Sequence, residues 1–505
     1  MASSTLKTLD VRFDGAKRDS LRAQHRFAIP GSRCSSSRFQ FFSPTPGHLC
    51  YSPGVLSGHC RGAFHSGRSG PVRFLMSSPD APFMVSPTTP TQYAHELAVQ
   101  ARAVASTLAT LTTAQKNSWL RRLAADLRAH ATQIHAANLL DLQAGQASGL
   151  SPALLDRLKL NPERVESLAR SVEAVVALPD PVGEVIEGSR RPNGLRVSRV
   201  RVPLGVVLFI YESRPNVTID AATLCLKSGN PVILRGGSES LQTNLVLSDL
   251  LARSLTAEGL PEHALQVVRS TDRAIVGDLL SMGKLIDVTI PRGGRALIER
   301  VTREATMPVI KHFDGICHVY LDQSADEQMA VDIVINSKCQ RPGVCNAAET
   351  LLLHREAAQR FWPALADTLL KRGVQLRCCP ESLVGLPGAV PATDQDFHTE
   401  HLDLILNVRI VDSLDQALSH IRTYGSGHTD AIVTSCLQAA TRFEAEVDSS
   451  AVVINASTRF NDGGELGLGA EIGISTDRFH ARGPCGLREM TSYKFVIRGD
   501  GQIRG

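Results

Sequence analysis

The amino-acid sequence predicts an α/β protein with two α/β domains in series and a small β element. Three observations lead to this fold class. The chain has 505 residues, of which 43% are hydrophobic, and this is enough to bury a large core in more than one domain. Short apolar runs alternate with helix-like segments along the body of the chain. One hairpin pattern precedes these runs.

The first 78 residues differ in composition from the rest of the chain. They are rich in Ser, Gly and Pro and poor in acids, of which they contain Asp10, Asp14 and Asp19. Arginines are spread through the segment: Arg12, Arg18, Arg22, Arg26, Arg33, Arg38, Arg61, Arg68 and Arg73. Organelle transit peptides have this composition, so we expect a leader that directs the protein to a plastid or, as second choice, to a mitochondrion. The alternative is a disordered tail with no targeting role on a cytoplasmic protein.

The next part of the chain is expected to be mainly helical. In residues 93–140 the apolar side chains recur at helical spacing and there is no proline, which predicts long amphipathic helices. The sequence Asn161-Pro162-Glu163 has the signature of a helix start, with Asn161 as the cap and Pro162 in the first turn.

A hairpin and then two sets of strands follow the helices. In residues 182–202, Val, Ile and Arg alternate around the turn sequence Arg191-Pro192-Asn193-Gly194, which predicts a β-hairpin. The apolar runs of the first set are residues 205–211, 231–234, 265–268 and 285–290, and those of the second are 317–321, 348–353, 406–411 and 431–434. Their alternation with helix-like segments predicts βαβ units in two parallel sheets.

Charge and composition exclude several kinds of partner. The net charge of +4 is small for this length, and much of the positive excess lies in the first seventy-odd residues, which argues against nucleic acid or membrane as the main partner. No run reaches the eighteen or so apolar residues that a membrane-spanning helix needs.

The cysteines predict free thiols in a reducing compartment, because eleven are too few to stabilise a chain of this length through disulfides. Cys378 and Cys379 have no second pair at ligand spacing, so we expect no metal site.

Two glycine-rich strand ends indicate a nucleotide. The sequence Arg235-Gly236-Gly237-Ser238 follows one predicted strand, and Pro291-Arg292-Gly293-Gly294 follows another. Glycines let the backbone approach a ligand, and a neighbouring arginine offers a fork for phosphate. Each motif alone fits a tight turn equally well. No G-x-G-x-x-G motif follows a predicted strand, and residues 277–284 do not complete a P-loop.

Cys345 is the candidate nucleophile. It lies in Gln340-Arg341-Pro342-Gly343-Val344-Cys345-Asn346, directly before an apolar run. A nucleophilic thiol needs a lowered pKa and backbone N–H groups directed at the developing oxyanion, and a Pro-Gly loop can supply access and free N–H groups. Free cysteines are also common as small hydrophobic core residues. The local sequence alone favours the structural role.

Other motifs along the chain bear on the role of the Cys345 loop. They are residues 211–217, with the sequence Tyr-Glu-Ser-Arg-Pro-Asn-Val, the two glycine-rich strand ends, and the C-terminal segments 453–460, 483–484 and 491–494. Together with the Cys345 loop they resemble, in order and without large insertions, the γ-glutamyl phosphate reductases, a family within the aldehyde dehydrogenase superfamily. The resemblance covers roughly residue 93 to the end.

The resemblance implies an aldehyde dehydrogenase-like fold with two Rossmann-type α/β domains and a small β oligomerisation element. Residues 90–180 and 203–315 would form an NADP-binding domain, and residues 316–486 a catalytic domain that carries Cys345. Residues 181–202 and 487–505 would form the oligomerisation element. Exposed strands there would pair with a partner's edge, so a homo-oligomer is implied.

The resemblance also implies roles for single residues. Cys345 corresponds to the family's nucleophile, and the backbone N–H of Asn346 can help to hold the oxyanion. Arg235 stands in the place of a cofactor-binding lysine, and Ser238 where NAD-preferring relatives often carry a glutamate, which favours NADPH over NADH. Glu400 corresponds to a glutamate near the nicotinamide ribose, although its local sequence fits a surface acid equally well. The other expected cofactor contacts are Gly236, Gly293 and Gly294.

The implied activity is the NADPH-dependent reduction of L-glutamyl 5-phosphate to L-glutamate 5-semialdehyde in proline biosynthesis, with release of phosphate, through a thioester on Cys345. Expected substrate contacts are Arg341, Asn455, Ser457 and Arg459. A glutamate 5-kinase is a candidate partner, because it would supply the acyl phosphate.

Two alternatives to this activity remain. The first is an aldehyde dehydrogenase that hydrolyses its thioester. Such enzymes carry a general-base glutamate before a Gly-Gly pair, where this chain has Asp314-Gly315-Ile316. The missing glutamate fits a reaction that needs no hydrolytic water, and we expect Asp314 to be structural. The second alternative is an inactive homologue that acts as a scaffold for a glutamate kinase.

Overall fold

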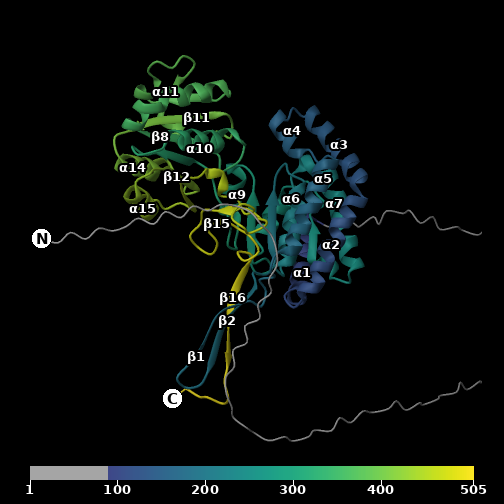
Figure 1. Ribbon diagram of the computed structural model, residues 1–505. Coiled ribbons are helices and arrows are strands. Elements are labelled where there is room, and N and C mark those ends of the chain that lie inside the picture. Colours follow the sequence, from purple (N-terminus) through teal and green to yellow (C-terminus); the bar gives the residue numbers. More distant parts are fainter. Residues whose placement is uncertain (1–88, 505) are drawn as a thin grey trace, which may run out of the picture. The chain divides into compact units, whose positions relative to one another are not determined.

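The computed structural model describes residues 89–504, and the first part of this range is helical (Figure 1). The helices are α1 (Pro90–Leu108), α2 (Thr113–Ala129), α3 (Ala131–Ala147), α4 (Pro152–Leu158) and α5 (Pro162–Ala177). As predicted, Asn161 caps α5: its side chain accepts a hydrogen bond from the backbone N–H of Arg164 at 3.0 Å. The leader expected in residues 1–78 lies outside the described residues, so the leader and the organelle stay predictions.

A four-stranded parallel sheet follows, in the order β5-β4-β3-β6. Its strands are β3 (Val207–Tyr211), β4 (Val232–Arg235), β5 (Leu265–Val267) and β6 (Val288–Arg292). The helices between and after them are α6 (Asn216–Lys227), α7 (Leu241–Ala257), α8 (Ala274–Leu280) and α9 (Arg295–Glu304).

Both faces of this first sheet are buried by helices. Because successive side chains of a strand point to opposite faces, Phe209 packs against α2, α5, α6 and α7, whereas Leu208 and Ile210 pack against α1, α8 and α9. A sheet covered on both faces has strands that are apolar at most positions. This explains why the sequence shows continuous apolar runs here.

The second sheet has seven strands, all parallel, in the order β10-β9-β11-β8-β7-β12-β13. Its strands are β7 (Cys317–Leu321), β8 (Ala348–His354), β9 (Gln375–Cys378), β10 (Val390–Pro391), β11 (Ile405–Val411), β12 (Thr429–Val433) and β13 (Ala451–Ile454). The accompanying helices are α10 (Glu327–Cys339), α11 (Arg355–Lys371), α12 (Pro380–Leu383), α13 (Asp394–Phe397), α14 (Leu414–Tyr424) and α15 (Leu437–Glu446). Leu351 and Leu353 pack against α10 and α11, and Leu352 against α14 and α15.

The predicted pair of parallel sheets is therefore confirmed, and each apolar run named above overlaps a strand. Three strands of the second sheet were not predicted. They are β9, β10 and β13, which lie toward the two edges of the sheet. Each has at most four residues.

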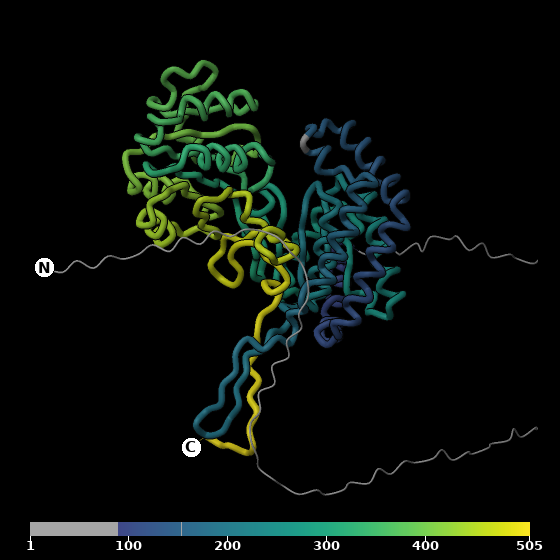
Figure 2. Tube along the Cα trace, viewed as in Figure 1, coloured from purple at the N-terminus to yellow at the C-terminus, as the bar shows by residue number. Residues whose placement is uncertain are grey.

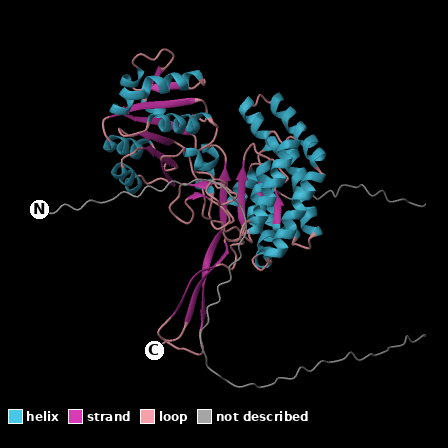
Figure 3. Cartoon of the chain, in the orientation of Figure 1, coloured by secondary structure: helices cyan, strands magenta, loops and turns pink. Residues whose placement is uncertain are grey.

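A separate three-stranded antiparallel ribbon is formed by β1 (Val185–Arg190), β2 (Arg196–Pro203) and β16 (Thr491–Arg498), in that order. Figure 2 shows the C-terminal segment running beside the hairpin. The predicted hairpin turn is present, since the N–H of Gly194 donates to the carbonyl of Arg191 at 2.9 Å. No helix covers the ribbon in Figure 3. Alternate side chains Tyr493, Phe495 and Ile497 of β16 are exposed.

The structure corrects the expected C-terminal boundary of the second domain. Residues up to 486 were assigned to it, but Ile472, Ala481 and Cys485 are buried in the core of the first sheet. The short strands β14 (Ile474–Ser475) and β15 (Gly483–Pro484) lie in this returning segment. The chain thus rejoins the first core near residue 472, before it enters the ribbon. None of the helices in residues 89–504 is long and apolar enough to cross a membrane.

Candidate active site

A cavity of about 580 Å³ opens beside the loop that carries Cys345. Its walls come from the segments that follow β3 and β6, from the loop between α10 and β8, and from loops near residues 400 and 460. Parallel sheets bind ligands at the carboxyl ends of their strands. The position of the cavity at the ends of β3 and β6 follows this rule.

A buried ion pair fixes the loop that carries the nucleophile. Lys338 lies in the last turn of α10, before the loop, and Glu349 lies in β8, after it. Their Nζ and Oε2 atoms are 3.0 Å apart, and both side chains have zero exposure. Burial, opposed by the charge of Lys338, raises the pKa of Glu349 to about 7. The other carboxylate oxygen accepts the N–H of Leu402 at 3.2 Å, so the same pair also holds the segment that carries Glu400.

Hydrogen bonds hold the backbone around Cys345. The hydroxyl of Thr458 donates to the carbonyl of Asn346 at 2.7 Å, and the side-chain amide of Asn346 donates to the carbonyl of Asn461 at 3.0 Å. On the other side, the thiol of Cys317 donates to the carbonyl of Cys345 at 3.1 Å. The backbone of Gly315 lies so close that a Cβ there would overlap this carbonyl oxygen. Only glycine fits at position 315.

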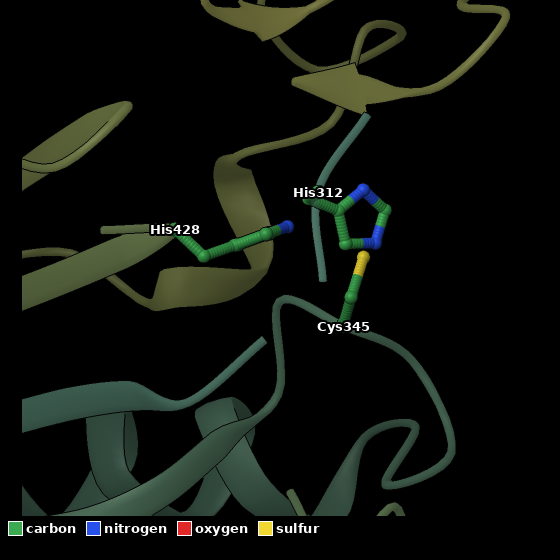
Figure 4. Close-up of side chains that lie close together, drawn as sticks. All are labelled: His312, Cys345 and His428. Atoms are coloured by element: carbon green, nitrogen blue, oxygen red, sulfur yellow. The ribbon is translucent and has the colours of Figure 1, made fainter. Parts of the chain in front are cut away.

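Two histidines that the sequence analysis did not single out lie next to the thiol (Figure 4). The sulfur of Cys345 and one ring nitrogen each of His312 and His428 lie within 4.8 Å of one another. Nδ1 of His312 is 2.8 Å from the carbonyl oxygen of Ile474. A carbonyl can only accept, so Nδ1 carries the proton and Nε2 is free for the thiol. Nδ1 of His428 is 2.8 Å from the hydroxyl of Thr429.

The two imidazoles change the acidity of the thiol. Burial alone would raise the pKa of Cys345, but the positive charge of His428 and the close approach of both rings outweigh it and hold the pKa well below its usual value. In return, although burial lowers the pKa of His312, the Cys345 thiolate raises it overall. Cys485 has no such neighbours, and burial raises its pKa to about 12. This contrast favours a nucleophile over a structural thiol at Cys345.

Arginines line the same cavity. They are Arg157, Arg214, Arg292, Arg341 and Arg459. Burial lowers the pKa of Arg214 to about 10, and the like charges of Arg292, Arg157 and Arg341 add to the effect. Within residues 89–504, none of Arg214, Arg292 and Arg341 forms an ion pair. Uncompensated guanidinium groups around one cavity favour a ligand with several negative charges. Of the expected substrate contacts, Arg341 and Arg459 therefore lie where a substrate can reach them.

Asn455 and Ser457 do not line the cavity, which corrects their expected role as substrate contacts. The side chain of Asn455 bonds both backbone groups of Thr434, at 2.8 and 2.9 Å. The hydroxyl of Ser457 accepts the N–H of Arg459 at 3.2 Å and lies 3.0 Å from the hydroxyl of Ser337. Their hydrogen-bonding groups are occupied within the protein, and they position the loop that carries Arg459.

Three of the expected cofactor residues line the cavity. Glu400 is half-buried there, and burial, followed by the negative charge of the Cys345 thiolate, raises its pKa to about 7. This burial contradicts a surface role. Gly293 and Gly294 line the cavity too, but the N–H of Gly294 donates to the carboxylate of Glu212 at 3.0 Å. This amide is therefore engaged by a protein carboxylate rather than left free for a phosphate.

The other three expected cofactor residues lie away from Cys345, at the end of β4 and just after it. Arg235, Gly236 and Ser238 do not line the cavity. The buried Nε of Arg235 has no partner within the described range, and the charges of Arg273 and Arg300 act on this guanidinium. A carboxylate does occur at this strand end, one residue after Ser238. It belongs to Glu239, which accepts the hydroxyl of Ser213 at 2.7 Å. Asp314 forms an ion pair with Arg295 at 2.5 Å, which fits its expected structural role.

Sequence reasoning missed His312, His428 and Arg214, whereas Arg292 belongs to one of the glycine-rich strand ends that it singled out. His312 stands two residues before Asp314, in the stretch that was compared with the general-base motif, and that position was an available signal. His428 precedes β12 and approaches Cys345 only in the folded chain.

Comparison with known proteins extends these findings. The aldehyde dehydrogenase family matches residues 82–378. The chain is similar to a γ-glutamyl phosphate reductase of Rhodopirellula baltica, with 55% identity over 81% of this chain and 94% of the relative. It is also similar to one of Heliobacterium modesticaldum, with 52% identity over 80% of this chain and 97% of the relative. The crystal structure of γ-glutamyl phosphate reductase from Thermotoga maritima matches with a TM-score of 0.79 and 44% identity, over 82% of this chain and all of that one.

The close contact at Gly315 yields a first prediction. Replacing Gly315 with Ala should displace the Cys345 backbone and lower turnover about 100-fold, because a shift of about 1 Å in a reacting group has an effect of that order. Turnover per folded molecule, with folding checked by circular dichroism, measures this. Gly277→Ala in α8 is the matched control, since its Cβ would meet only the end of the Arg300 side chain, at 3.8 Å. Equal turnover of the two variants would contradict the assigned contact.

The lowered pKa of Cys345 yields a second prediction. In the wild-type protein, alkylation of Cys345 by iodoacetamide should stay fast as the pH falls from 8 to 6, because the thiolate persists below the usual pKa. In His428→Gln the pKa rises, so the rate at pH 6 should drop about tenfold for each unit of the rise. Mass spectrometry of the peptide that contains Cys345 measures the rate, with a chelator present. Identical pH profiles in the two proteins would refute this electrostatic role of His428.

Proposed function

This chain belongs to the γ-glutamyl phosphate reductases of the aldehyde dehydrogenase family, and from that premise we propose that it reduces L-glutamyl 5-phosphate to L-glutamate 5-semialdehyde through a thioester on Cys345. It is an oxidoreductase of proline biosynthesis that acts on a small-molecule substrate. The observation that carries the detailed proposal is the thiol of Cys345 between two imidazoles, at a cavity lined by arginines.

The charges of the cavity suit this substrate. An acyl phosphate of glutamate carries a phosphate and an α-carboxylate, and Arg214, Arg292 and Arg341 offer forked donors for both. The α-ammonium group needs an acceptor, and the carboxylate of Glu471 also lines the cavity. The charged partners that the substrate needs are thus present around the thiol.

The chemistry begins at Cys345. Its thiolate attacks the γ-acyl carbon, the carbon–oxygen bond to phosphate breaks, and a thioester forms. The departing phosphate needs a proton, which Nε2 of His312 can donate once it has taken the proton of the Cys345 thiol, while Nδ1 keeps its own proton on the carbonyl of Ile474. Backbone N–H groups near Cys345 and Asn346 stabilise the oxyanion of each tetrahedral stage. After reduction, Cys345 leaves as the thiolate that its neighbours favour.

NADPH is the proposed cofactor, and when bound it supplies the hydride. Arg235 has an unpartnered buried Nε, and the charges of Glu239, Arg273 and Arg300 act on its guanidinium. A guanidinium with a free donor suits a 2′-phosphate. Glu400 lines the same cavity as the thiol, and its carboxylate could accept a hydrogen bond from a ribose hydroxyl.

Reduction is favoured over hydrolysis of the thioester. A hydrolytic enzyme needs a free general base to activate water. Asp314, which stands in the corresponding stretch, is paired with Arg295. The scaffold alternative gives no reason for a thiol held in a reactive state.

Assembly and partners complete the proposal. The exposed apolar residues Tyr493, Phe495 and Ile497 of β16 favour a homo-oligomer formed through the ribbon. The mass of the purified protein in light scattering tests this. A glutamate 5-kinase remains the proposed source of the acyl phosphate.

The assay that tests the function runs the reaction in reverse. With glutamate 5-semialdehyde and NADP⁺, the wild-type protein should form NADPH only when phosphate is present. Cys345→Ala should lose this activity entirely, because no other thiol of residues 89–504 lines the cavity. NADPH formation is followed by its absorbance. Activity that persists without phosphate would indicate the hydrolytic reaction, and no activity in wild type would favour the scaffold.

The basic group at Arg235 yields a test of cofactor choice. Arg235→Ala should lower kcat/KM for NADPH about tenfold more than for NADH, because only NADPH carries the phosphate that the guanidinium would bind. Steady-state kinetics with both cofactors measures the ratio. Arg303→Ala, an exposed arginine of α9, is the control. An equal loss with both cofactors would remove Arg235 from 2′-phosphate recognition.

A further inference from the structure

We propose that His312, Cys345 and His428 form a zinc site, and that a zinc ion bound there reversibly blocks the nucleophile. The three residues offer one sulfur and two ring nitrogens within 4.8 Å of one another. Thiolate and imidazole are the ligands that Zn²⁺ prefers, and zinc commonly takes three protein ligands and leaves a fourth position open. The inference concerns inhibition by a metal ion, and it does not depend on the proposed substrate.

The two histidines already have the orientation of zinc ligands. Nδ1 of His312 is held by the carbonyl of Ile474, and Nδ1 of His428 lies next to the hydroxyl of Thr429, each at 2.8 Å. Histidines that bind metals nearly always use their other nitrogen in this way. In both rings, Nε2 is therefore the nitrogen available to an ion, and Figure 4 shows both rings directed at the space beside the sulfur.

The second nitrogen of His428 lacks a partner. His428 has zero exposure, and its Nε2 has no hydrogen-bond partner among the described residues. A buried polar atom without a partner is unfavourable. Coordination to zinc would satisfy this nitrogen, which is an observation independent of the clustering of the three residues.

The geometry needs only a small adjustment. Zinc lies about 2.3 Å from a thiolate sulfur and about 2.0 Å from an imidazole nitrogen, which places ligand atoms roughly 3.5 Å apart. Atoms up to 4.8 Å apart must therefore approach by about 1 Å. Rotation of the Cys345 side chain, which lies in a loop and faces the cavity, can provide this. The fourth position then faces the cavity and takes a water molecule.

The charges around the site set a moderate affinity. The thiolate and the carboxylates of Glu400 and Glu471 attract a dication, whereas Arg214 and Arg292 oppose it. Binding also displaces any proton on the thiol and on His312, so affinity should fall as the pH is lowered. Such a site is weaker than a purely structural zinc site, which suits reversible binding. While zinc is bound, the sulfur lone pair needed for attack is engaged in the zinc–sulfur bond.

Direct binding to the full-length purified protein tests the proposal without any turnover. Zn²⁺ alone is titrated in competition with a chromogenic chelator, and we expect one ion per chain. Cys345→Ser and His312→Gln should each weaken binding at least tenfold, since each removes one of three ligands. His398→Gln is the matched control, because His398 lines the same cavity outside the cluster, and it should bind zinc as the wild type does.

A second measurement keeps the test independent of how the variants fold. Co²⁺ in the wild-type protein should give a thiolate-to-cobalt charge-transfer band in the near ultraviolet, and Zn²⁺ should slow alkylation of Cys345 at least tenfold. Absence of the band and of the protection, or zinc affinity unchanged in Cys345→Ser, would overturn the proposal. Zinc binding with no reductase activity would leave this site standing and remove only the proposed function.

Discussion

The ion pair between Lys338 and Glu349 is the constraint on which the rest of the site depends. A charge with zero exposure is tolerated only when it is paired, and here the two charges stand at either end of the loop that carries Cys345. Separating them would leave two buried charges alone, so the two ends of the loop must stay together. Because Glu349 also accepts the N–H of Leu402, the loop of the nucleophile and the segment of Glu400 are held as one unit. The thiol is therefore placed by electrostatics as well as by packing.

Around the loop that this ion pair fixes, the site holds like charges close together. Arg214 lies among other guanidinium groups. Its burial and the repulsion from these groups lower its pKa. His312 and Cys345 show the opposite case, where each partner stabilises the charged form of the other. The guanidinium groups repel one another while the site is empty. A negatively charged ligand neutralises them, so the filled site is more stable than the empty one. This is the arrangement expected of a cavity built for a highly charged molecule.

Much of the fold could be read from the sequence, because both sheets are covered on two faces and their strands contain runs of buried apolar residues, as in β3 and in Leu351–Leu353 of β8. Cys345 could be found because its loop is a continuous motif. His428 could not, since it comes to the thiol from a distant strand and no local pattern marks it. The expectation that Asn455 and Ser457 contact the substrate was wrong for a related reason. A matching motif shows that a loop is present, but only the structure shows which of its side chains face the cavity and which hold the loop in shape.

The ribbon has a consequence for the order in which the chain is built. Strand β2 pairs with β16, and Pro203 is opposite Thr491 in the register. On a ribosome that adds about 5–20 residues per second, β2 would wait on the order of 15–60 s for its second neighbour. Throughout that time one edge of the hairpin has no strand beside it, and unpaired edges are where nascent chains associate wrongly. The arginines of β2 (Arg196, Arg199 and Arg201) place positive charge along this unpaired edge. The charge would discourage pairing with other chains before β16 has been synthesised.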